Sequence, residues 1–455
     1  MDFNKERNTA IQHIAFAMGM FSTMPVVTIP LGSTDIAVFR ILFYGFLLYL
    51  LIKTLSGRVL IIKKEQKLLC LWLIIAIISG FVGWIALSSS HEQFSAAARS
   101  NILKTGAFLV FMALWGSQEH RSVKQLNEAL IRGLMVGCIL NVSWAIIDAG
   151  GYYLTGRSLN NIVFSGYIAR HNIRYNSLSL AYSSTGLIRA SGFNYDPAQL
   201  GFIVPVITSY AVIKRKYWLL VLAFGGIIAS ASTTALVCSM LVLVVNLAVK
   251  KERIKINRKT IIIGFAVLII AGLILSRFGE TLFRLTSSAI TKMTTRLNTT
   301  YLDNDTLDIR WDYLIMAPKA FLNLGIFMLT GLGFGTASYG YVIDNSILNK
   351  IGSVHNFAYD LENTYICYLM DTGIIGFFVF ILLLYRAYVF YKRAASASYA
   401  NNNDVLIYCG IEASVFSMLF YHYILFAPQM LILIVALSNM DLAGLDNDAL
   451  KKGSI

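Results

Sequence analysis

The chain has few charged side chains. Of its 455 residues, 14% are charged and 57% are apolar. Soluble domains usually carry about 25% charged residues, so this composition excludes a soluble multidomain protein. Apolar runs long enough to cross roughly 30 Å of hydrocarbon as helices recur along the sequence. We therefore expect an integral membrane protein.

The chain also lacks the alternation of apolar and polar residues that is typical of membrane β-barrel strands. Its spans must then satisfy their backbone hydrogen bonds within helices. We predict an all-α polytopic membrane protein of about 12 transmembrane helices, with a large periplasmic loop between the ninth and tenth spans. The expected parts are one transmembrane domain, 1–455, a first periplasmic loop, 150–197, and a large periplasmic loop with short helices, 277–361.

The net charge is +14, and most Lys and Arg lie in short loops between apolar runs. Such loops face the cytoplasm, so topology explains this charge better than a nucleic-acid partner does. The most basic loop is KKERIKINRK, residues 250–259, and its charge agrees with termini on the cytoplasmic side. The expected spans are 10–31, 35–52, 68–88, 102–116, 129–149, 199–213, 217–231, 233–249, 260–276 and 364–385, with two more before Met440.

Metal-ligand spacings are absent as well. The five cysteines lie within or beside apolar runs, and we interpret them as small packing residues without disulfides. We find no cluster of His, Cys and carboxylates at metal-ligand spacing and no glycine-rich nucleotide fingerprint. The sequence therefore disfavours a metal mechanism and a soluble nucleotide-sugar donor.

Arginines are present where topology does not account for them, in the two loops expected outside. Guanidinium groups bind phosphate through paired, planar hydrogen bonds, so they suit a lipid-linked phosphate or pyrophosphate at the bilayer surface. For any single arginine, contact with lipid head groups is the alternative. The candidates are Arg189, Arg284, Arg296 and Arg310.

Arg189 lies in LIRASGFNYDPAQLG, residues 187–201. Asp196 and Pro197 suit the start of the next helix, but a helix start does not explain Arg189. The junction ASASTTA, residues 229–235, contains small and hydroxyl side chains, which favour close helix packing over substrate contact.

In the large loop, DIRWDYLIMAPKAF places Arg310 on a short amphipathic helix, and GLGFG, residues 331–335, allows close backbone approach. His355 and Glu362 follow shortly before the tenth span. A base at this depth can deprotonate a sugar hydroxyl, although a lone histidine is often structural. Which of the two acts as the base stays open.

These segments together resemble the O-antigen polymerase and ligase superfamily. The resemblance rests on an R-x-x-G-F-x-x-D-P-x-x-x-G arrangement, on the large loop with Arg310 and G-L-G-F-G, and on ENTYICYLMDTGIIG, residues 362–376. The first arrangement consists of Arg189, Gly192, Phe193, Asp196, Pro197 and Gly201. Ligase-like members typically have His where this chain has Glu362, which favours a polymerase.

The resemblance implies a metal-independent glycosyltransferase without a cofactor. It would join undecaprenyl-pyrophosphate-linked oligosaccharide repeats on the periplasmic face, with membrane lipid and a chain-length-regulating co-polymerase as further partners. Glu362 or His355 would be catalytic, and the substrate-binding set would be Arg189, Arg310, Arg284, Arg296, Asn356, Asn363 and Tyr365. Two alternatives stay open: a ligase that transfers glycan to lipid A core, and a lipid-linked oligosaccharide flippase.

Overall fold

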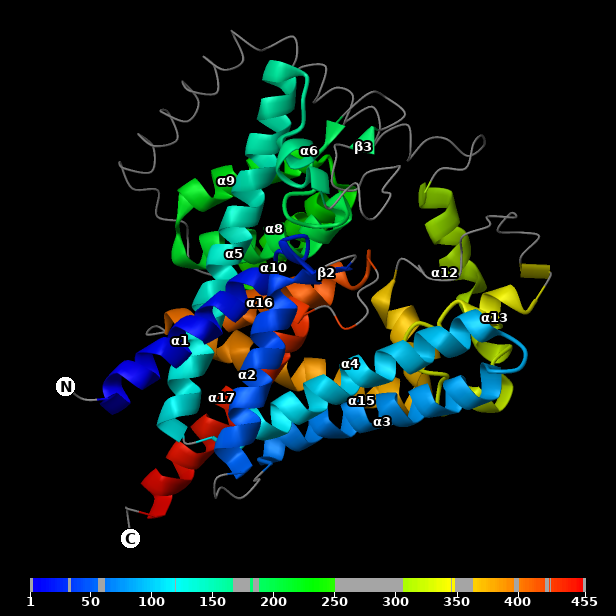
Figure 1. Cartoon of the computed structure of the whole chain (residues 1–455), viewed down its shortest axis with the longest axis horizontal. Helices are drawn as coiled ribbons and strands as arrows, with labels where there is room; N and C mark the ends of the chain where they lie inside the picture. The colour runs from blue at the N-terminus through cyan, green and yellow to red at the C-terminus, as the bar shows by residue number, and fades with distance from the viewer. Residues whose placement is uncertain are drawn as a thin grey trace. The chain divides into compact units, whose positions relative to one another are not determined.

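The computed structural model describes most of the chain in two compact units (Figure 1). One unit is formed by Met1–Asn141 and Thr306–Ile455, and the other by Val142–Asp305. The boundary lies inside the long helix α5 (His120–Thr155). The described residues are 3–31, 34–55, 62–118, 120–166, 181–182, 188–249, 306–344, 346–347, 363–396, 401–421, 425 and 427–452.

The first unit is built mainly from helices around an aromatic core. Trp72 on α3 packs against Phe334, Tyr368 and Phe380, with ring centroids 5.7, 5.5 and 5.1 Å away. Because Tyr368 and Phe380 belong to α15, these rings join α3 to α15. The elements are α1 (Phe3–Ser22), β1 (Thr28–Leu31), β2 (Thr34–Ala37), α2 (Val38–Leu55), α3 (Lys64–Leu87), α4 (Glu92–Gly116), α12 (Thr306–Leu322), η2 (Gly325–Met328), α13 (Tyr339–Val342), α15 (Thr364–Ser396), α16 (Asn402–Ser417) and α17 (Ala427–Lys452).

The second unit surrounds helix α8 (Leu200–Lys214), whose residues 200–211 are all buried. A helix that is apolar on every side must be covered on every side, and α9 and α10 pack against it. The other elements are α6 (Leu159–Val163), β3 (Ala181–Tyr182), β4 (Ile188–Arg189), η1 (Pro197–Gln199), α9 (Tyr217–Ser230) and α10 (Thr233–Val249).

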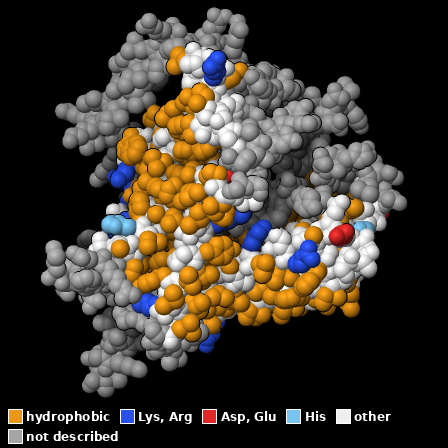
Figure 2. Space-filling model, viewed as in Figure 1, with side chains coloured by type: hydrophobic (Ala, Val, Ile, Leu, Met, Phe, Trp, Pro, Cys, Tyr) orange, Lys and Arg blue, Asp and Glu red, His pale blue; other side chains and the backbone are white. Residues whose placement is uncertain are grey.

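Several helices are long and apolar enough to cross a membrane. Apolar side chains cover much of the face drawn in Figure 2, and Ile85 and Leu103 are 71% and 77% exposed. Lipid tails solvate such a surface, whereas water does not. The chain is therefore a multi-pass membrane protein, and the count of about 12 spans stays a prediction. Within the described part, the candidates are Val38–Leu55, Lys64–Leu87, Ser122–Thr155, Pro197–Lys214 and Thr364–Ser396, with shorter apolar helices at Tyr217–Ser230, Thr233–Leu247, Tyr313–Leu322 and Ala427–Asp441.

The expected bounds hold for some spans and are wrong for others. α8, α9 and α10 begin and end within one residue of their expected positions. The first expected span, 10–31, is wrong: α1 ends at Ser22, and β1 pairs antiparallel with β2. The segment PVVTIP, residues 25–30, has two prolines around four β-branched residues, which disfavour a helix.

Two other helices are longer than expected. α4 begins at Glu92 instead of residue 102, so Arg99 lies in a helix and not in a loop. Its first turns, EQFSAAARSN, consist largely of helix-forming residues, but they are too polar to be recognised as part of an apolar membrane span. α15 continues past residue 385 to Ser396. The expected ninth span, 260–276, lies outside the described residues. All five cysteines are buried and none of them forms a disulfide.

Candidate functional site

Arg189 is held against the turn between α9 and α10 in the second unit. It ends β4, which pairs with β3, and its side chain is half-buried. The amide of Ala190 donates to the carbonyl of Ala229 at 2.9 Å. Arg189 Nε donates to the carbonyl of Ser230 at 3.4 Å. Backbone and guanidinium are thus both attached to the same turn.

That turn is the small-residue junction 229–235. Ala231 has φ 43°, a left-handed conformation that lets the chain reverse between the two helices. Ser232 Oγ accepts from the amide of Ala235 at 3.2 Å, which caps the start of α10. A Cβ on Gly201 would lie 2.4 Å from Thr234 Cγ2, so α8 and α10 touch closely here. The described contacts of the junction are those of a packing turn.

The residues that follow Arg189 shape the loop. Gly192 has φ 64°, which favours glycine. The ring of Phe193 stacks on Trp144 of α5 with centroids 5.3 Å apart. Asp196 Oδ1 accepts from the amide of Ala198 at 2.6 Å, and Pro197 is the first residue of η1. The helix start expected at Asp196 and Pro197 is confirmed.

A buried carboxylate, which sequence reasoning missed, anchors this loop. Asp148 on α5 is fully buried, and its Oδ1 accepts from Ser158 Oγ at 2.9 Å and from the amide of Asn160 at 3.0 Å. Asn160 Nδ2 in turn donates to the carbonyl of Gly192 at 3.1 Å, and its Oδ1 accepts from Trp144 Nε1 at 2.6 Å. The available signal was a carboxylate inside an expected span, at 129–149, which is costly unless it has a role.

In the first unit, the predicted substrate-binding residues Asn363 and Tyr365 lie together at the start of α15. Asn363 Oδ1 accepts from the amide of Ile366 at 3.1 Å, and its Nδ2 donates to the carbonyl of Leu419 at 3.0 Å. Tyr365 OH donates to the carbonyl of Val415 at 2.9 Å. Both side chains therefore tie α15 to the end of α16. Their part in substrate binding stays a prediction.

The GLGFG turn is fastened to a second buried carboxylate. Gly331, Gly333 and Gly335 all have positive φ, at 71°, 93° and 88°. The amide of Gly333 donates to the carbonyl of Asp371 at 2.7 Å. The Asp371 carboxylate, which is fully buried, accepts from the amides of Gly335 and Thr336 at 3.3 and 3.1 Å. Only glycine accommodates this backbone at such close range.

The same turn is wedged against α3 and α4. A Cβ on Gly83 of α3 would lie 1.7 Å from the carbonyl oxygen of Leu332. Asn101 Nδ2 of α4 donates to the carbonyl of Phe334 at 2.8 Å. The glycines of this turn thus serve close packing among three helices.

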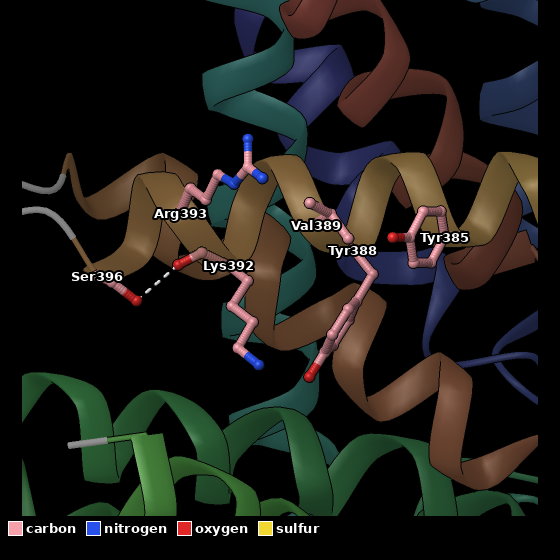
Figure 3. A pocket seen from close by; sticks show the side chains of 6 residues that line it. All are labelled: Tyr385, Tyr388, Val389, Lys392, Arg393 and Ser396. Carbon is pink, nitrogen blue, oxygen red and sulfur yellow. Dashed lines mark hydrogen bonds between the residues drawn. The ribbon is translucent and has the colours of Figure 1, made fainter. Parts of the chain in front are cut away.

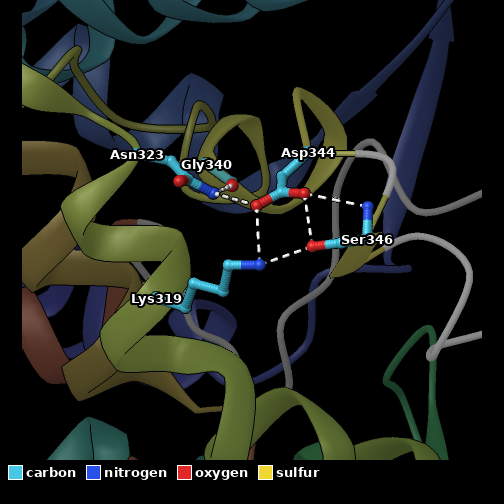
Figure 4. Close-up of polar contacts among 5 residues, drawn as sticks. All are labelled: Lys319, Asn323, Gly340, Asp344 and Ser346. Carbon is cyan, nitrogen blue, oxygen red and sulfur yellow. Dashed lines mark hydrogen bonds and ion pairs between the residues drawn. The ribbon is translucent and has the colours of Figure 1, made fainter.

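Arg310 lies in α12, which confirms the short helix predicted around it, although its side chain is outside the described part. Farther along α12, Lys319 Nζ forms an ion pair with Asp344 Oδ2 at 3.1 Å (Figure 4). Asp344 Oδ1 also accepts from the amide of Ser346 at 2.8 Å. Hydrogen bonds from Ser346 and Lys319 lower the pKa of the Asp344 carboxyl below its ordinary value.

The structure describes some of the predicted site residues and not others. Arg189 belongs to the second unit, and Arg310, Asn363 and Tyr365 belong to the first. Within the described ranges, no three His, Cys, Asp or Glu side chains are grouped as metal ligands. Five predicted residues lie outside the described residues: Glu362, His355, Asn356, Arg284 and Arg296.

A comparison with protein families matches residues 218–381 to O-antigen ligase. The matched segment begins in α9 and ends in α15, and it includes the α9–α10 turn, α12, the GLGFG turn and Asn363. No curated protein matches the chain at a significant level. The match covers 164 of the 455 residues, and for this segment it confirms the resemblance to the O-antigen polymerase and ligase superfamily that the sequence predicts.

Proposed function

We propose that this membrane protein of polysaccharide assembly is an O-antigen polymerase. It joins undecaprenyl-pyrophosphate-linked repeat units on the periplasmic face of the bacterial inner membrane. The observation that carries the proposal is the hydrogen bond from Arg189 to the carbonyl of Ser230. It ties a guanidinium from outside the family-matched segment to a turn inside it, at the junction of two apolar helices. A cation there suits an anionic group at the membrane surface.

The chemistry is a glycosyl transfer between two lipid-linked glycans. A hydroxyl of the acceptor attacks the anomeric carbon of the donor, and the bond from that carbon to the pyrophosphate oxygen breaks. The electron pair leaves with the lipid pyrophosphate, and the hydroxyl proton passes to a base, Glu362 or His355. Arginines of the predicted set stabilise the charge that develops on the leaving group, and Arg189 is the member whose side-chain contact the structure describes.

Asn363 contributes rigidity to this scheme. It immediately precedes α15 and is hydrogen-bonded to the carbonyl of Leu419, just after α16, so the chain has a fixed point one residue after Glu362. A base must be held within hydrogen-bond reach of the proton that it removes. Positioning of this kind supplies much of the catalysis in a reaction without a cofactor.

A ligase is the second candidate, because the matching family is described as O-antigen ligase. Such an enzyme would transfer the finished glycan from the lipid carrier to lipid A core. Glu362, in the place where ligase-like members typically have His, favours the polymerase.

The test is an assay of purified protein with a synthetic undecaprenyl-pyrophosphate repeat unit. We expect a ladder of lengthened glycans that disappears in Arg189→Ala and persists in Arg132→Ala. Arg132 is the matched control, since it is exposed on α5 and already paired with Glu128 at 3.4 Å. Equal ladders in both variants would contradict the anion site.

Further arms of the assay separate the alternatives. Loss of the ladder in Glu362→Gln but not in His355→Gln would identify Glu362 as the base. The reverse result would identify His355. Transfer that begins only when lipid A core is added would show a ligase. Movement of the lipid-linked sugar across liposomes, without a new glycosidic bond, would overturn the enzyme proposal.

A further inference from the structure

Helix α15 is longer than a membrane requires. It is kinked at Gly373, whose φ of 66° and ψ of −177° are not helical, and the 23 residues after the kink extend for about 35 Å, whereas the hydrocarbon core is about 30 Å thick. The apolar run of this part ends at Leu384 and is followed by Arg386, Lys392 and Arg393, so the hydrocarbon core ends near Leu384. From Tyr385 the helix then passes through the layer of lipid head groups, which the long side chains of Lys392 and Arg393 can reach.

A surface pocket of about 590 Å³ is found on this part of α15. Its size falls in the range of roughly 300–1,000 Å³ that is typical of small-molecule sites. The lining side chains all come from this stretch of α15, and in Figure 3 Tyr388 and Lys392 point to one side of the helix and Arg393 to the other. The lining residues are Tyr385, Tyr388, Val389, Lys392, Arg393 and Ser396.

The cations of α15 differ in their partners. Arg386 Nη2 lies 2.6 Å from Glu65 Oε1 of α3, so its charge is neutralised within the protein. Lys392 and Arg393 have no carboxylate partner in the part of the chain that the structure describes. Lys392 Nζ lies instead 5.6 Å from the centre of the Tyr388 ring. Two positive charges therefore line the pocket without an anion from the described residues.

We propose that this pocket binds the phosphate of an anionic glycerophospholipid. Lys392 and Arg393 supply the positive charge, and Tyr385 and Tyr388 pack beside the glycerol backbone. Three features point to this ligand: the depth of the pocket in the bilayer, its charge, and tyrosines of the kind that line membrane interfaces. The site is independent of the reaction proposed above, since none of its residues belongs to the predicted catalytic or substrate-binding set.

Native mass spectrometry of the purified protein, titrated with phosphatidylglycerol and with phosphatidylcholine, tests the proposal. We expect tighter binding of phosphatidylglycerol to the wild type. In Lys392→Gln/Arg393→Gln this affinity should fall about 30-fold, because each basic residue near a membrane surface contributes about fivefold. Arg386→Gln on the same helix is the matched control and should bind as the wild type does.

Other results would overturn the proposal. Unchanged phosphatidylglycerol binding in the double variant would show that the pocket is not the site. An equal loss in Arg386→Gln would show a general effect of helix charge. Displacement of the lipid by millimolar inorganic phosphate would show that the pocket recognises free phosphate. Thermal unfolding of each variant, expected to match the wild type, shows that the protein is folded.

Discussion

The loop 188–201 in the second unit and the exit segment 363–376 in the first use polar side chains differently. In the exit segment, Asn363, Tyr365 and Asp371 all bond to backbone groups of neighbouring segments. In the loop, Asp196 accepts a hydrogen bond from the amide of Ala198, two residues later, whereas Arg189 places a half-buried guanidinium against the carbonyl of Ser230. The loop thus carries a cation suited to an anion, and the described part of the exit segment is mainly a scaffold.

The largest effect should come from disturbing the scaffold. We expect Gly83→Ala to lower the free energy of unfolding by about 3 kcal/mol, because the new Cβ meets the carbonyl of Leu332 and neither backbone can yield. Gly106→Ala is the control, since a Cβ there has nothing within 4 Å. Denaturation in detergent measures both. Equal stability of the two variants would contradict the close contact between α3 and the GLGFG turn.

Removing the cation should affect activity more than folding. On the proposed function, Arg189→Ala should slow glycan polymerisation about 100-fold, which is typical when one group that stabilises developing charge is lost. Arg189→Lys should have an intermediate rate, because lysine keeps the positive charge but cannot form the paired, planar hydrogen bonds of a guanidinium. A rate assay alongside thermal unfolding separates the effects. If the rate falls only in proportion to the amount of folded protein lost, Arg189 has no role in the reaction beyond its contribution to folding.

The loop also depends on a buried anchor. We expect Asp148→Asn to cost about 2 kcal/mol of unfolding free energy, since hydrogen bonds to a charged acceptor from Ser158 and the amide of Asn160 are weakened. Glu128→Gln, an exposed carboxylate on the same helix, is the control. A double-mutant cycle with Ser158→Ala should show that the two losses are not additive. Additive losses would mean that the two side chains act independently.

The smallest effect is expected at Asp344, which is near the surface and joins the end of α13 to α12. A lowered pKa means that its ion pair with Lys319 contributes fully above the ordinary carboxyl value of 3.8. The contribution is lost as the pH falls through the lowered pKa. Asp344→Asn should speed hydrogen exchange at the amide of Ser346 at neutral pH, with no measurable global change. A difference that persists in strong acid would rule out the carboxylate as the cause.

Much of the fold could be predicted because hydropathy and helix length are local properties of a sequence. They identified the membrane class and the bounds of α8, α9 and α10. They failed at residues 28–37, where an apolar run forms a hairpin, and at the ends of α4 and α15, where a helix continues beyond its apolar part. Hydropathy reports which residues suit lipid and not where a helix stops.

The sequence by itself determined that this is a helical membrane protein, and it showed a resemblance to the O-antigen polymerase and ligase superfamily that the family match over residues 218–381 confirms. Only the tertiary structure decided what surrounds the motifs. Asp371 meets Thr336 across 35 residues of chain, and Asn101 meets Phe334 across 233. Asp148 reaches the loop of Arg189 through Asn160. Such contacts depend on which helices pack together, and that choice is made by the shapes and polar groups of distant segments at once.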